Sequence, residues 1–296
     1  MPKRALVTYA VDVDACANWI NTRDGTKIGA TDVSRGIFGA NTGTDRMLKL
    51  FADHNIKASW YMPSHTILSF PEQMAKVRDA GHEIGLHGYT HEFVRFLTEE
   101  QERKVMAKSI EVYQQFTGKY PKGWVAPAWE VSPKTMSILE DFGIEYDHSM
   151  LHHDCQPYYV ADVPEDSVAH TDYSQDPDTW MKPMKEHKPT TVVEIPGSWN
   201  VDDWRTHGFV NPRDIEMQWR DQFDFFYREY ETFVFCISCH PQVSGKSNVM
   251  LMHERLIEYL KTKEGVEFVT MAQICDEFKA GKLEGVTIKA GVPDAE

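Results

Sequence analysis

The sequence has no long apolar run and no block of basic residues, and each absence excludes a class of protein. No run of about 18 apolar residues occurs, which argues against a membrane-spanning helix and a membrane partner. The formal net charge of −14 argues against a nucleic-acid partner, because such binding needs basic patches. A hydrophobic fraction of 42% is sufficient for the core of a large globular domain.

Cysteines are few and follow no disulfide framework. There are five, an odd number, and only Cys236 and Cys239 form a CxxC pattern. That pair lies in a strand-like run, where residues three apart point to opposite faces, so we expect buried reduced thiols rather than a redox or zinc pair. The apolar part of residues 1–9 is too short for a signal peptide and acidic residues follow, so we expect a cytoplasmic protein.

Strand and helix patterns alternate along most of the chain. This alternation predicts parallel strands with outer helices, and a closed α/β barrel formed by all 296 residues as a single domain. The expected strands are 3–11, 56–62, 82–86, 123–126, 144–147, 190–195, 232–238 and 266–270. The expected helices are 44–55, 71–80, 98–117, 132–142, 211–230, 247–261 and 271–279.

Two long stretches lack this periodicity. The polar segment 18–43 follows the first strand, and its length indicates a function beyond connection. The segment 149–188, rich in Asp, His, Pro and Tyr, is either a plain surface loop or a cover over an active site. Residues from about 284 onwards have the composition of a tail.

His87 and His91 follow the third expected strand with a spacing of four. If the chain turns into a helix there, both imidazoles lie on one face and can bind one metal ion. With 13 histidines in the chain, chance alone gives about half of one such pair, and His148 and His152 form a second. The spacing therefore needs support from other residues.

That support comes from the ends of other strands. In a barrel of parallel strands, catalytic groups lie at the carboxyl ends of the strands. Asp12 and Asp14 end the first expected strand, His87 and His91 follow the third, and His240 follows the strand 232–238. We therefore expect these five side chains to share one site.

The five residue types fit hydrolysis of an amide-type bond. Asp14, His87 and His91 form the two-imidazole, one-carboxylate ligand set of a catalytic divalent metal, most typically zinc. Such an ion lowers the pKa of water to about 7. Asp12 can then take a proton from the attacking water, and His240 can protonate the leaving nitrogen.

Other interpretations of the same residues remain open. An isolated Asp-x-Asp is usually a solvated pair or a magnesium ligand, and a magnesium site would suit a phosphohydrolase. Two histidine ligands argue against magnesium, which prefers oxygen ligands. His240 alone fits a turn. A non-catalytic metal-binding scaffold would keep the barrel and the metal ligands without needing a base and an acid.

The ordered motifs resemble the polysaccharide deacetylase family, also called NodB-homology or carbohydrate esterase family 4. The resemblance covers about residues 3–278 and rests on 8–14 (TYAVDVD), 87–91 (HGYTH), 125–127 (VAP), 194–199 (EIPGSW) and 237–241 (ISCHP). It implies a distorted (β/α)7 barrel. It also implies Asp12 as base, Asp14, His87 and His91 as metal ligands, and His240 as acid.

Further motifs are similar to one branch, which contains the Helicobacter peptidoglycan-deacetylase-like protein, cyclic imide hydrolase and allantoinases. They are 34–39 (SRGIFG), 124–130 (WVAPAWE), 152–159 (HHDCQPYY) and 240–245 (HPQVSG). The branch implies a homotetramer. The family's usual arginine, which orients the base, is Val125 here, and Arg35 is our candidate replacement; otherwise Arg35 is a surface or subunit-contact residue.

We expect a small amide or cyclic imide as substrate, because an intracellular enzyme cannot easily reach cell-wall polymer. The alternative is an N-deacetylase of chitin-type or peptidoglycan-type N-acetyl sugars. Residues expected at the substrate, besides Arg35, are Trp129, Glu130, Asp154, Tyr158 and Trp199, although such aromatic side chains more often belong to a core.

Overall fold

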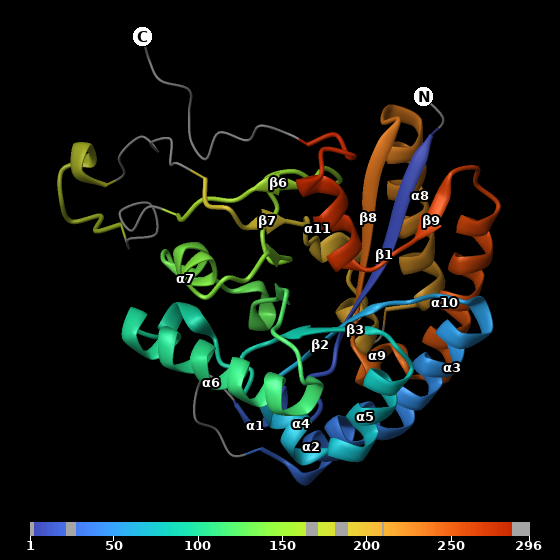
Figure 1. Cartoon of the computed structure of the whole chain (residues 1–296), viewed down its shortest axis with the longest axis horizontal. Helices are drawn as coiled ribbons and strands as arrows, with labels where there is room; N and C mark the ends of the chain where they lie inside the picture. Colours follow the sequence, from blue (N-terminus) through green and yellow to red (C-terminus); the bar gives the residue numbers. More distant parts are fainter. Residues whose placement is uncertain (1–2, 22–27, 164–170, 181–188, 209, 286–296) are drawn as a thin grey trace.

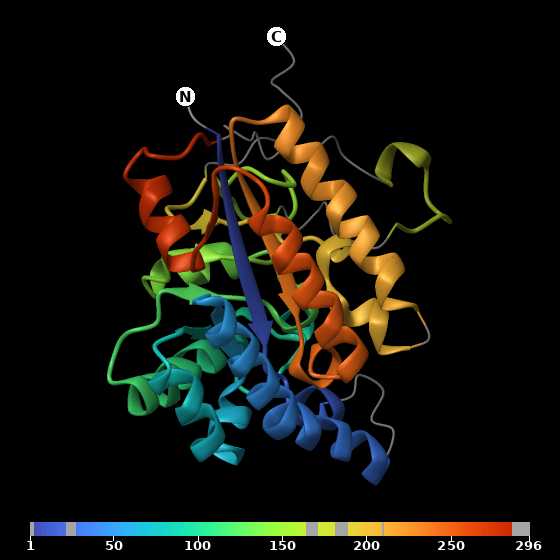
Figure 2. The same ribbon diagram turned by 90° about the vertical axis from the view of Figure 1, so that its right-hand side faces the viewer.

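The central strand β1 (Arg4–Asp12) runs through the middle of the molecule in the computed structural model, which describes residues 3–21, 28–163, 171–180, 189–208 and 210–285 (Figures 1 and 2). Every residue of β1 after Arg4 is buried, as expected for a strand covered on both faces. Its side chains alternate between two cores. Tyr9 and Val11 face the larger core beneath the helices, and Leu6 and Ala10 face a smaller one on the opposite side.

The strands form one sheet that curls towards a barrel. Its order is β6-β7-β5-β4-β3-β2-β1-β8, with β9 beside the start of β1. All pairings are parallel except that of β6 with β7. The bounds are β2 (Ser59–Met62), β3 (Glu83–Leu86), β4 (Gly123–Trp124), β5 (Tyr146–Asp147), β6 (Tyr158–Tyr159), β7 (Val193–Glu194), β8 (Thr232–Cys239) and β9 (Val266–Phe268).

The curl is incomplete between the end strands β6 and β8. Among the described residues, a single parallel bridge from Asp202 to Ser238 and a bond from the Val234 N–H to the Cys155 carbonyl (2.9 Å) link the two sides. The fold is therefore the distorted α/β barrel that the sequence predicts, with its strands shortened on the β4-β5-β7 side.

Helices cover the outside of the sheet (Figures 1 and 2). They are α1 (Ala17–Ile20), α2 (Ala30–Phe38), α3 (Thr44–His54), α4 (Ser64–Ser69), α5 (Pro71–Asp79), α6 (Glu99–Thr117), α7 (Thr135–Asp141), α8 (Pro212–Glu229), α9 (Pro241–Ser244), α10 (Ser247–Lys261) and α11 (Met271–Lys279). Among the described residues, no helix combines the length and apolar character needed to cross a membrane.

Most predicted elements are confirmed, but the short helices α4 and α9 were not expected, and three further elements differ. The segment 18–43 contains α1, α2 and a π-helix (Gly39–Gly43) rather than an irregular loop. Strand β6 was not expected. Helix α7 begins at Thr135, later than the expected range 132–142, and the Ser132 and Thr135 hydroxyls both donate to the buried Glu102 carboxylate (2.6 Å each). The parts of the predicted loops and tail at 22–27, 164–170, 181–188 and 286–296 lie outside the described residues.

All five cysteines are free and buried, which confirms the expectation of reduced thiols. Cys239 belongs to the larger core and Cys236 to the smaller one, so the two thiols point to opposite faces of β8. The CxxC pattern therefore forms neither a disulfide nor a metal-binding pair.

Two glycines leave room for tyrosine rings in the smaller core. A Cβ on Gly123 would lie 1.9 Å from Tyr146 Cζ, and one on Gly85 would lie 2.5 Å from Tyr61 Cδ1. The two rings meet through their hydroxyls (2.8 Å), and Tyr146 also donates to Glu83 Oε1 (2.6 Å).

We predict that Gly123→Ala lowers the free energy of unfolding by about 3 kcal/mol, because the buried Tyr146 ring must move. Urea unfolding followed by circular dichroism measures this. The matched control is Gly29→Ala, whose Cβ would meet nothing closer than 3.8 Å and which should change stability by less than about 0.5 kcal/mol. Equal stability of the two variants would contradict the prediction.

Candidate active site

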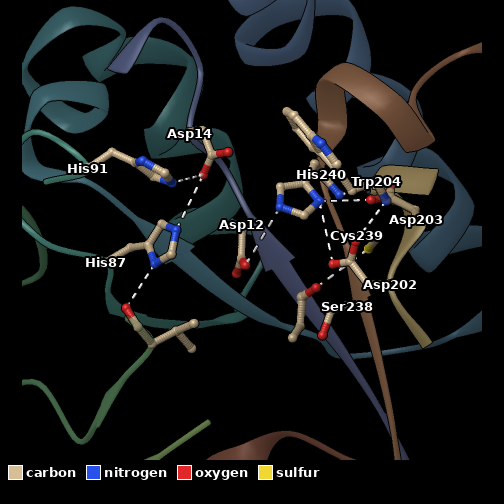
Figure 3. A network of polar contacts seen from close by, with 12 residues as sticks. Asp12, Asp14, His87, His91, Asp202, Asp203, Trp204, Ser238, Cys239 and His240 are labelled. Atoms are coloured by element: carbon tan, nitrogen blue, oxygen red, sulfur yellow. Dashed lines mark hydrogen bonds and ion pairs between the residues drawn. The ribbon is translucent and has the colours of Figure 1, made fainter. Parts of the chain in front are cut away.

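A cavity of about 230 Å³ lies at the carboxyl ends of β1, β3 and β8. The five side chains that we expected to share one site all line this cavity: Asp12, Asp14, His87, His91 and His240 (Figure 3). The lining residues are Asp12, Asp14, Asn18, His87, His91, Phe93, Ala126, Ala128, Trp129, Trp199, Asp202, Trp204 and His240. The cavity thus combines a polar floor with walls that contain three tryptophans.

A tight turn rather than a helix brings His87 and His91 together. Gly88 (φ +72°) and His91 (φ +60°) both adopt left-handed backbone conformations. The Glu92 carboxylate accepts hydrogen bonds from the backbone N–H groups of Tyr89 (2.9 Å) and Thr90 (2.6 Å), which holds the turn. The two imidazole centroids lie 5.0 Å apart.

Asp14, His87 and His91 fit a divalent metal ion. Asp14 Oδ1 lies 3.3 Å from His87 Nε2 and 3.6 Å from His91 Nε2, and it is buried without a hydrogen-bond donor. Ligand atoms at about 2.0–2.2 Å from a tetrahedral zinc ion are about 3.3–3.6 Å from one another, so these separations match. The donor set and the unpartnered oxygen both support a cation at this point.

Neighbouring groups orient two of these ligands. His87 Nδ1 donates to the Val125 carbonyl (2.8 Å), which leaves the Nε2 lone pair towards Asp14. Gln242 Nε2 donates to Asp14 Oδ2 (3.1 Å). His91 Nδ1 has no partner among the described residues. Burial favours the neutral form of Asp14, but the imidazoles outweigh it and lower the pKa of Asp14 well below its usual range.

Asp12 lies between His87 and His240 (Figure 3). Only 4% of its surface is exposed, and its Oδ1 has no hydrogen-bond donor. Burial raises the pKa of Asp12, while His87 and His240 partly offset this effect. The carboxylate is therefore available to accept a proton inside the cavity.

His240 faces Asp12 with one ring nitrogen and Asp203 with the other. Nε2 lies 3.9 Å from Asp12 Oδ2, and Nδ1 donates to Asp203 Oδ1 (2.7 Å). Burial alone would lower the pKa of His240, but Asp203 and then Asp202 outweigh it and raise this pKa well above its usual value. The ring is therefore held as a proton donor that points into the cavity.

Sequence reasoning missed Asp203 and its neighbour Asp202. Asp202 lines the cavity, and burial raises its pKa to about 7. The two adjacent acidic residues follow the 194–199 motif closely, which is the one indication that the sequence offered.

Of the residues expected at the substrate, Trp129 and Trp199 line the cavity, with ring centroids 4.8 Å apart. Glu130, Asp154 and Tyr158 do not. Glu130 pairs with Arg95 (2.9 Å), and Asp154 is exposed beside His153. The Tyr158 hydroxyl is buried and accepts the His152 N–H (2.9 Å), so it supports the chain at 152–158 instead.

Arg35 does not replace the family arginine in the described structure. Its guanidinium pairs with Asp32 (2.6 Å) and lies over the Trp19 ring (5.8 Å). The cavity-lining residues given above include neither arginine nor lysine. Two imidazoles flank Asp12 instead, while the backbone of Val125 holds His87.

The second histidine pair forms no metal site. His148 is buried, with Nδ1 bonded to the Ile195 carbonyl (2.6 Å) and Nε2 near Ser238 Oγ (3.1 Å). His152 stacks on Tyr158 at 5.3 Å between centroids. The described part of the segment 149–188 also contributes no residue to the cavity lining.

Comparisons with known proteins agree on one family. The polysaccharide deacetylase family model matches residues 34–146. The chain is 44% identical to the peptidoglycan deacetylase of Helicobacter pylori over 94% of its own length and 97% of that protein. It is 34% identical to the peptidoglycan deacetylase-like protein FGM2 of Gibberella zeae, covering 95% of this chain and 88% of that protein.

Solved structures share the fold. The crystal structure of Puue allantoinase superposes with a TM-score of 0.76 at 22% identity, covering 94% of this chain and 91% of that one. At this identity the likeness shows the barrel alone.

We predict that His91→Ala lowers zinc affinity at least about 100-fold, since even the loss of a residue that only orients a ligand costs 10- to 100-fold. Competition with a fluorescent chelator, together with elemental analysis, measures this. The control His152→Ala should bind zinc as the wild type does. Retention of wild-type affinity by His91→Ala would exclude His91 as a ligand.

Proposed function

Because this chain belongs to the polysaccharide deacetylase family, hydrolases of carbon–nitrogen bonds other than peptide bonds, we propose that it hydrolyses a small amide or cyclic imide. One observation carries the proposal. In a small cavity, Asp12 lies between a set of three metal-binding side chains and His240 (Figure 3).

Asp14, His87 and His91 would hold the metal ion, and zinc fits best because two imidazoles and a carboxylate are typical of catalytic zinc sites. A divalent ion there supplies Lewis-acid polarisation of the amide carbonyl and lowers the pKa of water.

The chain's own residues move the protons. The Asp12 carboxylate takes one proton from the attacking water as the new carbon–oxygen bond forms. His240 gives its Nε2 proton to the nitrogen as the carbon–nitrogen bond breaks. The Asp203 carboxylate holds the ring through Nδ1, so Nε2 is the nitrogen that faces the reacting group.

The size and walls of the cavity support a small substrate. Its volume of about 230 Å³ is below the roughly 300–1,000 Å³ of pockets for drug-sized ligands. Trp129, Trp199 and Trp204 provide flat apolar faces for a planar ring.

A second candidate is an N-acetyl sugar. Trp199 stands at the cavity mouth with 52% of its surface exposed, and an exposed tryptophan can stack beneath a sugar ring. The Helicobacter pylori relative is a peptidoglycan deacetylase, which favours the same substrate class.

Location and assembly are parts of the proposal. We propose a cytoplasmic protein, and the five free cysteines support this, since thiols persist in a reducing compartment. The homotetramer implied by the resemblance remains a prediction.

We predict that the protein hydrolyses succinimide, hydantoin or allantoin, and that this activity stops when a chelator removes the metal. Chromatography of the products, with the same enzyme offered chitin oligomers and peptidoglycan, measures it. Release of acetate from the polymers with all ring compounds untouched would favour the N-acetyl sugar instead.

Asp12→Asn should lower kcat/KM about 10²- to 10⁴-fold while zinc content stays at the wild-type level, because the base is lost and the ligands remain. The control is Asp53→Asn on the exposed face of α3, which should keep full activity. A non-catalytic scaffold would show no turnover in wild-type protein, and undiminished activity of Asp12→Asn would remove Asp12 as base.

A further inference from the structure

We propose that Ser244 and His253 are positioning residues for His240, which they reach through Asp203 by a directed chain of hydrogen bonds that begins at Tyr9. The inference rests on the proposed function, in which His240 is the proton donor. Neither residue lines the cavity.

The contacts form a continuous path from the site into the helix layer. Asp203 Oδ2 accepts the His240 backbone N–H (2.9 Å) and the Ser244 hydroxyl. Ser244 Oγ lies 2.7 Å from His253 Nε2, and His253 Nδ1 lies 3.3 Å from the Tyr9 hydroxyl. Asp203, Ser244, His253 and Tyr9 are all fully buried.

The charge of Asp203 fixes the direction of every bond in this path. An ionised carboxylate only accepts, so Ser244 must donate its single proton to Asp203. Ser244 Oγ must then accept from His253, which places the proton of that imidazole on Nε2. Burial lowers the pKa of His253 to about 4, so the ring is neutral and carries one proton. His253 Nδ1 is therefore the acceptor, and Tyr9 is the donor at the far end.

Local structure makes the path rigid. Helix α9 follows His240 directly, and the Ser244 N–H donates to the His240 carbonyl (2.7 Å), so Ser244 and His240 belong to one turn. His253 lies on α10 between the rings of Tyr9 (5.6 Å) and Trp219 (5.9 Å). An imidazole buried among such groups needs partners for both nitrogens, and this path supplies them.

The expected consequence is control of the proton affinity of His240. Charged or titratable groups face His240 from β1 (Asp12), from the segment that follows β1 (Asp14), from the turn after β3 (His91), and from the segment after η6 (Trp199–Val201), which carries Asp202 and Asp203. Cys239 on β8 and Lys246 after α9 face Asp203. Tyr9 and Asp203 face His253.

The Asp203 carboxylate accepts hydrogen bonds from the Ser244 hydroxyl as well as from His240, so its negative charge is shared between the two residues. Without the Ser244 hydroxyl, the Asp203 carboxylate interacts more strongly with the His240 ring, and the pKa of His240 rises. Without the charge of Asp203, the pKa of His240 falls. The two changes therefore act in opposite directions.

Histidine side-chain NMR on the wild-type protein tests the direction of the path, and a variant serves only to assign the signals. We expect His253, identified by the signals lost in His253→Gln, to be neutral with its proton on Nε2 from pH 6 to 8. A proton on Nδ1, or a charged ring in that range, would overturn the inference.

The pH dependence of kcat/KM tests the effect on His240, whose protonated form the reaction needs, so activity falls as pH rises through its pKa. We expect Ser244→Ala to move this alkaline limb up by about 0.5–1 pH unit, His253→Phe to move it up by less, and Asp203→Asn to move it down. Ser244→Thr, which keeps the hydroxyl, and the buried control Ser109→Ala should match the wild type.

The inference would be overturned if the alkaline limb of Ser244→Ala coincided with that of the wild type or shifted downwards. It would also be overturned if the limb of Ser244→Thr shifted as far as that of Ser244→Ala. His240→Ala separates this failure from failure of the proposed function. Full activity in His240→Ala would refute the assignment of His240 as acid, whereas an inactive His240→Ala with unshifted Ser244→Ala would refute only the role of Ser244 and His253.

Discussion

The rest of the site depends on one buried carboxylate, that of Asp14. Its Oδ1 points at two imidazole nitrogens and has no donor, and an unpaired charge in the interior is costly. A cation at that point removes the cost. The turn braced by Glu92 and the carbonyl of Val125 place the imidazoles. The fold thus stabilises an arrangement that is favourable only with a positive charge at its centre.

The proposed division between base and acid rests on the surroundings of two side chains in the same cavity. Asp12 has an oxygen without a donor, which suits a proton acceptor. His240 is fixed by the carboxylate of Asp203, which favours its protonated form. Because Asp203 is itself held by Ser244 and, through it, by His253, the proposed acid depends on residues that do not line the cavity.

The sequence predicted those parts of the site that follow from topology, and missed those that depend on tertiary contacts. The rule that parallel strands end at one edge was sufficient to bring Asp12, Asp14, His87, His91 and His240 together. The stretch 87–91 is a turn and not a helix, because the Glu92 carboxylate accepts hydrogen bonds from the backbone N–H groups of Tyr89 and Thr90. Arg35 was placed at the site by analogy with a missing arginine, but Asp32, three residues before it on the same helix, pairs with it. Asp203 and His253 lie on separate segments and are connected by hydrogen bonds through Ser244. No local sequence pattern predicts a contact of this kind.

The most direct test of the central claim is anomalous X-ray diffraction from crystals of the protein loaded with zinc. The account predicts one dominant peak at about 2.0–2.2 Å from Asp14 Oδ1 and from Nε2 of both His87 and His91, with Asp12 and His240 on the adjoining cavity wall. A dominant peak elsewhere, for example beside His153 and Asp154, with no density between the two imidazoles, would contradict it.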